Sequence, residues 1–187
     1  PLAKEDFDEK DFISDREKFH IVYLGNLLDH KNAIGLIKAM KNLDDMKLTI
    51  MGSGKLEKEL QNYVIESKLE NRITFTGHVS DKEISTIFLK SDIFCAPSRY
   101  EQFSLVYLEA LAHGLPVVGY GPTIDAIRNE IGMDCGFSLE DYSPESIKDA
   151  ITEVRGKEWN RILLRDKIIS AFSPILIAKR FANAIMQ

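Results

Sequence analysis

The chain of 187 residues has little of what marks several protein classes. It has only two cysteines, Cys95 and Cys135, with no CxxC spacing and no histidine partner nearby. We therefore expect two buried free thiols, and neither a disulfide framework nor a zinc site. No apolar run reaches the roughly 18–20 residues that a membrane span needs, and no signal peptide is visible. An initiator methionine is also lacking, so the chain reads as a piece of something longer or as a processed product.

An excess of basic charge is lacking too. The 24 basic and 29 acidic residues give a net charge of −5 and a pI near 5.4. Nucleic-acid binding is not expected, because neutralising phosphates needs a basic face. The share of hydrophobic residues, 44%, is that of an ordinary globular protein. It excludes a disordered tail or a fibre, and the length indicates one domain with its own core.

The order of segments predicts an α/β fold. Residues 1–18 are polar and predict a linker or lead-in, so the domain covers 19–187. Short apolar runs then alternate with amphipathic helical patterns, which is typical of βαβ units around a parallel sheet. The expected strands are Ile21–Leu24, Lys47–Met51, Arg72–Thr76, Ile93–Ala96, Pro116–Val118 and, more weakly, Gly136–Ser138.

The helical segments complete the prediction. One helix is expected from Leu105, and extra C-terminal helices follow the last strand, with Pro144 and Pro174 at positions where helices start. The fold class is therefore Rossmann-like, a doubly wound parallel sheet with helices on both faces. Ligands of such sheets bind beyond the carboxyl ends of the strands. The loops to inspect there are Gly25–Lys31, Gly52–Lys55, Gly77–Ser80, Pro97–Ser104 and Gly119–Thr123.

Two of these loops carry an ambiguous signal. Lys31 lies near the start of a helix, whose N-terminus is already partly positive. An anion such as a phosphate between the two would explain this position, but a solvated surface lysine explains it equally well. Gly52-Ser53-Gly54 allows close backbone approach to a ligand, yet a tight turn between a strand and a helix is the better reading of a lone GxG.

The stretch from Pro97 to Val118 is more informative. Glu101 lies in the loop before a helix, Ser104 is a candidate N-cap, and Glu109 follows within the helix. Two carboxylates thus flank a helix N-terminus that could hold an anion, which suits sugars on both sides of a diphosphate. The alternative is a surface glutamate at 101 and a solvated one at 109, and it is the stronger reading for any generic pair of glutamates.

The full pattern resembles a known family. Glu101-x7-Glu109, which continues as Glu-Ala-Leu-Ala-x-Gly-x-Pro-Val-Val, closely resembles the signature of glycosyltransferase family 4. These are retaining, metal-independent enzymes of GT-B architecture. Gly25…Lys31, Gly52-Ser-Gly54, Phe75-Thr-Gly77 and Ser91–Ser98 fall into register with it, and the lead-in looks like an interdomain linker. The similarity covers only the C-terminal, donor-binding half of such an enzyme.

The resemblance implies a role for each matching residue. Lys31 would contact the donor pyrophosphate, and Glu101 would hold hydroxyls of the transferred sugar near the reaction centre. Glu109 would accept hydrogen bonds from the ribose. The other donor-binding positions would be Gly25 and Asn26, the backbone N–H groups of Phe103, Ser104 and Leu105, and, around the nucleotide base, Gly52, Ser53, Gly54 and Val79.

Three departures qualify the resemblance. Asn26 stands where the family usually has arginine, so one phosphate-neutralising charge is missing, and Arg99 is the candidate to compensate. The usual Gly-Phe-Gly reads Gln102-Phe103-Ser104, which is tolerable if only the backbone binds. The usual Gly-Ile-Pro-Glu has become Pro122-Thr-Ile-Asp125, which puts the role of that loop in doubt.

The implied function is donor binding for a retaining transfer of sugar from a UDP-, GDP- or ADP-linked donor to an acceptor hydroxyl, with no cofactor or metal. An N-terminal acceptor-binding domain would be missing, and the acceptor would be a sugar or a lipid-linked glycan. The location implied is cytoplasmic, with peripheral contact to the inner membrane through that missing domain. A non-catalytic nucleotide-binding or interaction module on the same fold is the alternative, and Asn26 lends it weight.

Overall fold

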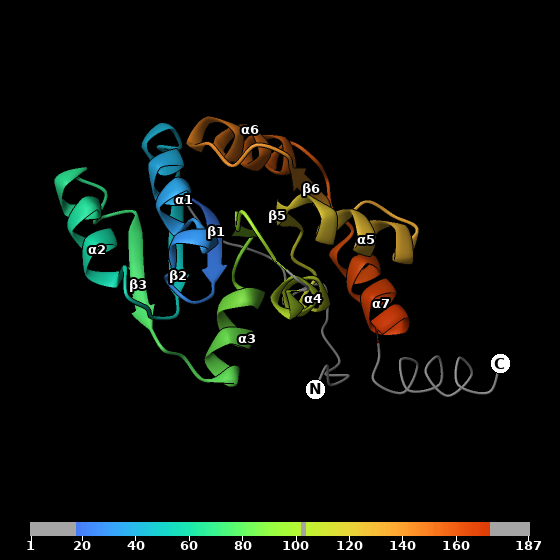
Figure 1. Ribbon diagram of the computed structural model, residues 1–187. Coiled ribbons are helices and arrows are strands. Elements are labelled where there is room, and N and C mark those ends of the chain that lie inside the picture. Colours follow the sequence, from blue (N-terminus) through green and yellow to red (C-terminus); the bar gives the residue numbers. More distant parts are fainter. Residues whose placement is uncertain (1–17, 102–103, 173–187) are drawn as a thin grey trace.

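A computed structural model of the chain describes residues 18–101 and 104–172 (Figure 1). The expected lead-in up to residue 17, Phe103 and the helix expected from Pro174 lie outside the described residues. The strands are β1 (Phe19–Leu24), β2 (Met46–Met51), β3 (Ile73–Gly77), β4 (Ile93–Ala96), β5 (Val117–Tyr120) and β6 (Gly136–Leu139). The helices are α1 (Ala33–Ala39), α2 (Glu57–Glu66), α3 (Asp81–Leu89), α4 (Leu105–Ala112), α5 (Gly121–Ile131), α6 (Pro144–Arg155) and α7 (Arg161–Phe172).

The six strands form one parallel sheet in the order β3-β2-β1-β4-β5-β6. Each expected strand is confirmed: β4 has the expected bounds, and the bounds of the others differ by at most two residues at either end. The strands form where the sequence is almost wholly apolar, because both faces of the sheet are covered; all four residues of β4 are buried. The doubly wound, Rossmann-like fold class is confirmed.

The strand order creates a switch point between β1 and β4. From β1 the chain winds outward through β2 to β3, and it then returns to β4 on the other side of β1 and winds outward through β5 to β6. The loops after β1 and β4 therefore diverge at their carboxyl ends. This is the place where open α/β sheets leave a crevice for a ligand.

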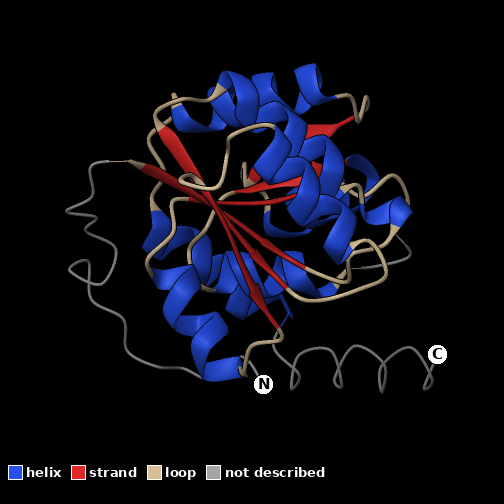
Figure 2. Cartoon of the chain, turned by 90° about the vertical axis from the view of Figure 1, so that its left-hand side faces the viewer, coloured by secondary structure: helices blue, strands red, loops and turns tan. Residues whose placement is uncertain are grey.

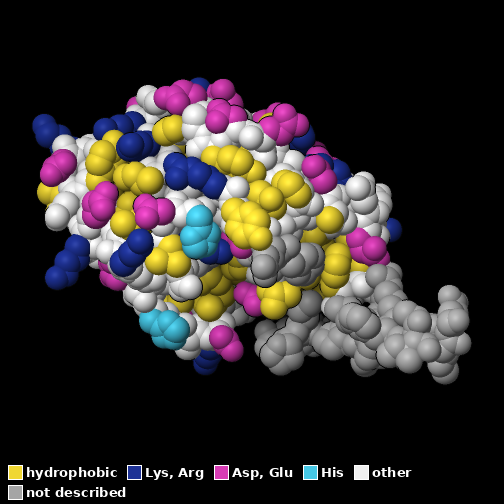
Figure 3. All heavy atoms as spheres, in the orientation of Figure 1, with side chains coloured by type: hydrophobic (Ala, Val, Ile, Leu, Met, Phe, Trp, Pro, Cys, Tyr) yellow, Lys and Arg dark blue, Asp and Glu magenta, His cyan; other side chains and the backbone are white. Residues whose placement is uncertain are grey.

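Helices cover both faces of the sheet (Figure 2). Helix α1 packs against α2 and α6, while α7 packs against α4 and α5. The core between these layers is made of aliphatic side chains from every strand, and Cys95 and Cys135 are buried in it as free thiols, as expected. On the face in Figure 3, basic and acidic side chains are interspersed and do not gather into a single basic field.

Helix α5 corrects one expectation. Gly119–Thr123 is not a loop, because Gly119 lies within β5, which ends at Tyr120, and α5 begins directly afterwards at Gly121. Pro122 occupies the first turn of α5, where its missing N–H costs nothing. Gly132 ends the helix in the left-handed conformation, with φ of 65°. The side chains that α5 buries are spaced as on one helical face, namely Ile124, Ile127 and Ile131.

Polar residues at the amino-terminal edge of the sheet satisfy one another. The backbone N–H of His20 donates to Asp92 Oδ2 at 2.7 Å, and His20 Nε2 lies 2.8 Å from Thr49 Oγ1. His20 Nδ1 lies 3.2 Å from the carbonyl oxygen of Lys90, and the buried Ser91 hydroxyl donates to Ile87 O at 2.7 Å. These bonds tie β1, β2 and the α3–β4 connection together.

Within residues 18–101 and 104–172, none of the helices has the length and apolarity that crossing a membrane requires.

Candidate functional site

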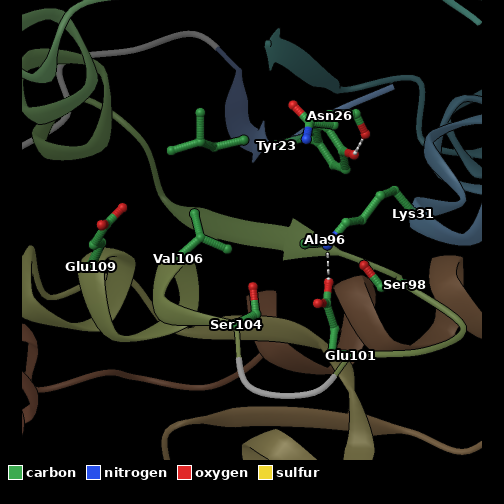
Figure 4. A pocket seen from close by; sticks show the side chains of 11 residues that line it. Tyr23, Asn26, Lys31, Ala96, Ser98, Glu101, Ser104, Val106 and Glu109 are labelled. Atoms are coloured by element: carbon green, nitrogen blue, oxygen red, sulfur yellow. Dashed lines mark hydrogen bonds and ion pairs between the residues drawn. The ribbon is translucent and has the colours of Figure 1, made fainter. Parts of the chain in front are cut away.

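A cavity of about 280 Å³ opens at the carboxyl ends of β1 and β4, at the switch point of the sheet (Figure 4). Its wall combines the β1–α1 loop, the β4–α4 loop and the first turns of α4. Its lining residues are Tyr23, Leu24, Gly25, Asn26, Lys31, Ala96, Ser98, Glu101, Ser104, Val106 and Glu109. Six positions expected from the sequence thus lie in one cavity: Gly25, Asn26, Lys31, Glu101, Ser104 and Glu109.

Lys31 and Glu101 form an ion pair inside this cavity. Lys31 Nζ lies 2.5 Å from Glu101 Oε1, and the two side chains are only 22% and 11% exposed. Lys31 ends a short 3₁₀ turn (Asp29–Lys31), and Asn32 follows it in the left-handed conformation before α1 begins. Neither a solvated surface lysine nor a surface glutamate describes this arrangement. The fold brings together two charges that are 70 residues apart in the sequence.

Tyr23, in β1, holds the β1–α1 loop in place through its side chain. Its ring is buried, and its hydroxyl donates to the backbone carbonyl of Asn26 at 3.2 Å. Burial raises the pKa of Tyr23 above its ordinary value, and the negative charge of Glu101 raises it further. The hydroxyl therefore stays protonated and can keep donating. Gly25 suits this packing, because a Cβ there would lie 3.1 Å from the Tyr23 hydroxyl oxygen.

The N-terminus of α4 points its first turn at the cavity. Ser104 occupies the N-cap position as expected, but its side chain makes no capping hydrogen bond. The first N–H groups of an α-helix have no intrahelical partner, so they remain able to bind an anion. Val106 lines the cavity, whereas Leu105 does not and its residue is 63% exposed. Leu105 was expected at the site through its backbone N–H group.

Tyr107 anchors this helix to the sheet. Its buried hydroxyl donates to the carbonyl of Ala96 at 2.6 Å and accepts from the N–H of Tyr120 at 2.9 Å. One side chain thus joins α4 to the ends of β4 and β5. A Cβ at Gly119 would lie 2.2 Å from the Tyr107 hydroxyl oxygen, so this bridge requires a glycine there.

Glu109 stands at the other end of the cavity from the Lys31–Glu101 pair (Figure 4). Partial burial raises the pKa of its carboxyl, and the negative charge of Asp81 raises it further. No cation of the described residues forms an ion pair with it. A carboxylate that is partly desolvated and lacks a counter-ion is well placed to accept hydrogen bonds from a ligand.

The Gly52-Ser53-Gly54 loop lies behind the cavity and is not part of its lining. A Cβ at Gly52 would lie 2.2 Å from Gly25 O, and one at Gly54 would lie 2.5 Å from Leu27 O. The N–H of Leu27 donates to Ser53 O at 3.0 Å. The glycines therefore allow the β2–α2 loop to approach the loop after β1 closely. Val79, expected beside the nucleotide base, is also absent from the lining of the cavity.

Arg99 is not among the residues that line this cavity. Its guanidinium donates to Asn32 Oδ1 at 3.2 Å, and Asn32 Nδ2 donates in turn to Tyr142 O at 3.0 Å. The candidate to compensate for Asn26 thus lies outside the first cavity, and its role stays a prediction. It lines a second cavity, of about 360 Å³, together with Asn32, Ile34, Gly35, Lys38, Asp141, Tyr142, Ser143 and Pro144.

Sequence reasoning assigned no role to five lining residues, which are Tyr23, Leu24, Ala96, Ser98 and Val106. Tyr23 and Leu24 are the last two residues of β1, Ala96 ends β4, and Val106 is the second residue of α4. Their positions follow from the switch point between β1 and β4. Ser98 differs, because the hydroxyl oxygen of its side chain is buried and has no partner among the described residues. No sequence pattern marks such an oxygen.

Comparison with known proteins identifies the family. The family model described as "Glycosyl transferases group 1" matches residues 4–170. An uncharacterised glycosyltransferase of Methanocaldococcus jannaschii is 30% identical over 147 residues, which are 76% of this chain and 37% of that protein. The poly(glycerol-phosphate) alpha-glucosyltransferase of Bacillus subtilis is 29% identical over 146 residues, which are 76% of this chain and 21% of that protein. The chain therefore spans well under half the length of these curated relatives.

Solved structures agree on the fold. The structure of Anabaena HepE in complex with UDP and glucose superposes on this chain with a TM-score of 0.76 at 20% identity. The match covers 91% of this chain and 49% of the HepE chain. The sucrose-phosphate synthase of Thermosynechococcus elongatus gives a TM-score of 0.74 at 24% identity, over 91% of this chain and 45% of that one. At these identities the likeness shows the Rossmann-like fold of GT-B glycosyltransferases. With the family model spanning most of its length, the chain belongs to the group 1 glycosyl transferases.

Proposed function

We propose that this chain is the donor-binding domain of a retaining glycosyltransferase. It would bind a nucleotide-diphosphate sugar in the cavity at the β1–β4 switch point. The sugar would pass to an acceptor hydroxyl that is held by a part of the full-length protein outside this chain. The short span relative to its curated relatives supports the last point.

One observation carries the proposal. A single cavity holds Glu101 and Glu109 at its two ends and, between them, the first turn of α4 (Figure 4). A sugar, a diphosphate and a ribose, joined in this order, need hydroxyl acceptors at both ends and an anion site in the middle. Carboxylates at the ends and helix N–H groups in the middle meet that need.

The chemistry follows from charge. When the bond between the sugar and the diphosphate breaks, negative charge grows on the leaving phosphate. Lys31 and the N-terminus of α4 would stabilise that charge, which is an electrostatic contribution to catalysis. Lys31 is paired with Glu101 at 2.5 Å, so the donor would have to share or replace this pair. Glu101 would then be free to accept a hydroxyl of the sugar. We assign no general base.

The charge balance bears on affinity. Lys31 is the one basic side chain among the described lining residues, beside the two carboxylates of Glu101 and Glu109. A diphosphate therefore meets little net positive charge, and Asn26 adds none. We expect weak binding by this chain alone, because an open cavity also leaves the ligand half solvated. The same observation favours the second candidate, a non-catalytic nucleotide-binding module.

A binding screen tests the proposal. The 187-residue chain is titrated with UDP, GDP, ADP and their sugar conjugates, by calorimetry or by ligand-detected NMR. We expect one base to be preferred and the sugar conjugate to bind. We also expect no transfer to a lipid or oligosaccharide acceptor, because the acceptor would be held by a part of the protein outside this chain, and positioning supplies roughly 7–11 kcal/mol of a lowered barrier.

Two results would contradict the proposal. If no nucleotide or conjugate binds at millimolar concentration, the cavity is not a donor site. If these residues alone transfer sugar efficiently, the acceptor site lies within the chain. To separate enzyme from module, turnover is measured in the full-length parent protein: hydrolysis or transfer supports the enzyme, and nucleotide binding without either supports the module.

A further inference from the structure

We infer that Ser98 is a further donor-binding residue, whose hydroxyl forms a hydrogen bond with a hydroxyl group of the transferred sugar. The inference rests on the proposed function and names a residue and a ligand group within that site. It starts from one buried side-chain oxygen. Ser98 is 1% exposed, and its Oγ has no hydrogen-bond partner among the described residues.

Such an oxygen calls for an explanation. Buried hydroxyls almost always have a hydrogen-bond partner, because an unmade bond is costly once water has been excluded. The backbone N–H of Ser98 is satisfied, since it donates to Ala96 O at 2.8 Å in the turn that ends β4. The turn thus holds the residue in place by its backbone and leaves the side chain unused. The hydroxyl makes no hydrogen bond that stabilises the described part of the fold, so it can form one with a ligand.

The place of Ser98 indicates which ligand. It lines the cavity, together with Lys31 and Glu101. Figure 4 shows its hydroxyl pointing toward the Lys31–Glu101 pair, at the end of the cavity away from Glu109. If Glu109 receives the ribose and the first turn of α4 receives the diphosphate, Ser98 lies at the sugar end. Because Ser98 is only 1% exposed, a group of the donor has to seat deeply in the cavity to reach it.

The chemistry also fits a sugar. An ionised carboxylate such as Glu101 only accepts hydrogen bonds, whereas a serine hydroxyl donates one and accepts others. A sugar hydroxyl also donates and accepts. Ser98 and Glu101 lie three residues apart on one loop. Together they can bind one or two sugar hydroxyls so that the serine hydroxyl and each sugar hydroxyl donate a hydrogen bond to an acceptor. A phosphate oxygen could only accept from Ser98, and that contact is the alternative which the experiment separates.

The experiment compares two ligands in two variants. Dissociation constants are measured for the preferred nucleoside diphosphate and for its sugar conjugate, in the parent chain and in Ser98→Ala. We expect the variant to bind the conjugate roughly 2- to 13-fold more weakly, as for one neutral hydrogen bond, and to bind the diphosphate as the parent does. Deoxy analogues of the sugar then identify the hydroxyl: the one that Ser98 contacts loses affinity in the parent and loses none in Ser98→Ala.

A second buried serine provides the matched control. The Ser91 side chain donates to Ile87 O at 2.7 Å, and it lies at the opposite edge of the sheet. Ser91→Ala should lower the melting temperature and leave both affinities unchanged. Ser98→Ala should not lower it, because no bond is lost. If Ser98→Ala fails to fold, Ser98→Cys replaces the hydroxyl by a slightly larger thiol that is a weaker donor, and it should show a smaller loss for the conjugate alone.

The outcomes separate this inference from the proposed function. If the parent chain binds neither ligand, the proposed function fails and the role of Ser98 fails with it. If the parent binds both and Ser98→Ala binds both equally well, only the Ser98 inference is overturned. If the variant loses affinity equally for both ligands, Ser98 contacts the diphosphate, and its assignment to the sugar is wrong.

Discussion

The two edges of the sheet differ in how their polar groups are partnered. At the amino-terminal edge, His20, Thr49, Ser91 and Asp92 are joined by hydrogen bonds to one another or to nearby backbone. At the carboxyl-terminal edge, the Glu109 carboxyl forms no ion pair and the Ser98 hydroxyl has no partner, both within the described residues.

The contrast separates stability from binding. A satisfied network contributes to the free energy of folding, and removing one member leaves another unpaired. Polar groups without partners cost stability, and they are kept where a ligand completes them. We therefore expect substitutions in the network at the amino-terminal edge to change stability alone, and substitutions of residues that line the first cavity to change binding. Four predictions test this division, in order of decreasing effect.

Lys31→Ala should have the largest effect. It removes the one basic side chain among the described lining residues. A charge-assisted hydrogen bond is worth roughly 1.5–3 kcal/mol, so affinity for a nucleoside diphosphate should fall by about 10- to 150-fold. A bare nucleoside should bind as before, and the loss should shrink at high salt. Equal losses for diphosphate and nucleoside, measured by calorimetry, would make Lys31 a structural residue.

Glu109→Gln should weaken binding of the nucleotide sugar by about tenfold at neutral pH, the lower end for a bond to a charged group. Because burial raises the pKa of Glu109, its carboxyl takes up a proton at a higher pH than an ordinary glutamate. Affinity of the parent chain should therefore begin to fall on acidification before an ordinary glutamate would titrate. The conjugate is the right ligand here, because its diphosphate does not titrate in this range.

Two variants sharpen the pH test. Asp81→Asn removes the negative charge that helps to raise the pKa of Glu109, so the loss of affinity should move to lower pH. Glu109→Gln should bind with no such pH dependence. It should also be no less stable than the parent, because a carboxyl whose pKa is raised by folding destabilises the folded state when ionised. An unchanged pH profile in Asp81→Asn would contradict this account of the shift.

Asp92→Ala should lower stability and leave binding intact. It removes the acceptor of the His20 backbone N–H, a bond of 2.7 Å. The cost should be about 1–2 kcal/mol, which lowers the melting temperature by roughly 2–8 °C at this chain length. Asp92→Asn keeps an acceptor at this position and is the control. A loss of nucleotide affinity in a folded Asp92→Ala would break the division between the two edges.

Arg99→Ala should have the smallest effect. Its guanidinium donates to Asn32 and lines the second cavity, so it makes no contact with the proposed donor site. Affinity for the nucleotide sugar should change by less than about twofold, which is within RT of the parent. A tenfold loss, measured in the same titration, would mean that Arg99 replaces the arginine missing at position 26.

Much of this fold could be predicted from the sequence. The apolar runs located all six strands, and the switch point follows once they are known. Helix α5 was missed because Gly121 and Pro122 look like a loop, although proline is harmless in a first turn. The pattern of isoleucines at 124, 127 and 131 carried the helical signal.

The site was harder to predict, for two physical reasons. A Gly-x-Gly loop has the same sequence whether its backbone approaches a ligand or another loop, and Gly52 and Gly54 approach the loop after β1. Contacts across the sheet have no local signal either. The Lys31–Glu101 pair joins residues 70 positions apart, and the unsatisfied oxygen of Ser98 depends on every atom around it.

The most direct test of the central claim is a map of where the nucleotide sugar binds. Backbone amide shifts of the 15N-labelled chain are followed during titration with the preferred conjugate. The account predicts that shifts concentrate at residues around the first cavity, including Asn26, Lys31, Ser98 and Val106, and leave the second cavity, marked by Ile34 and Ser143, unchanged. Shifts that concentrate around the second cavity would contradict it.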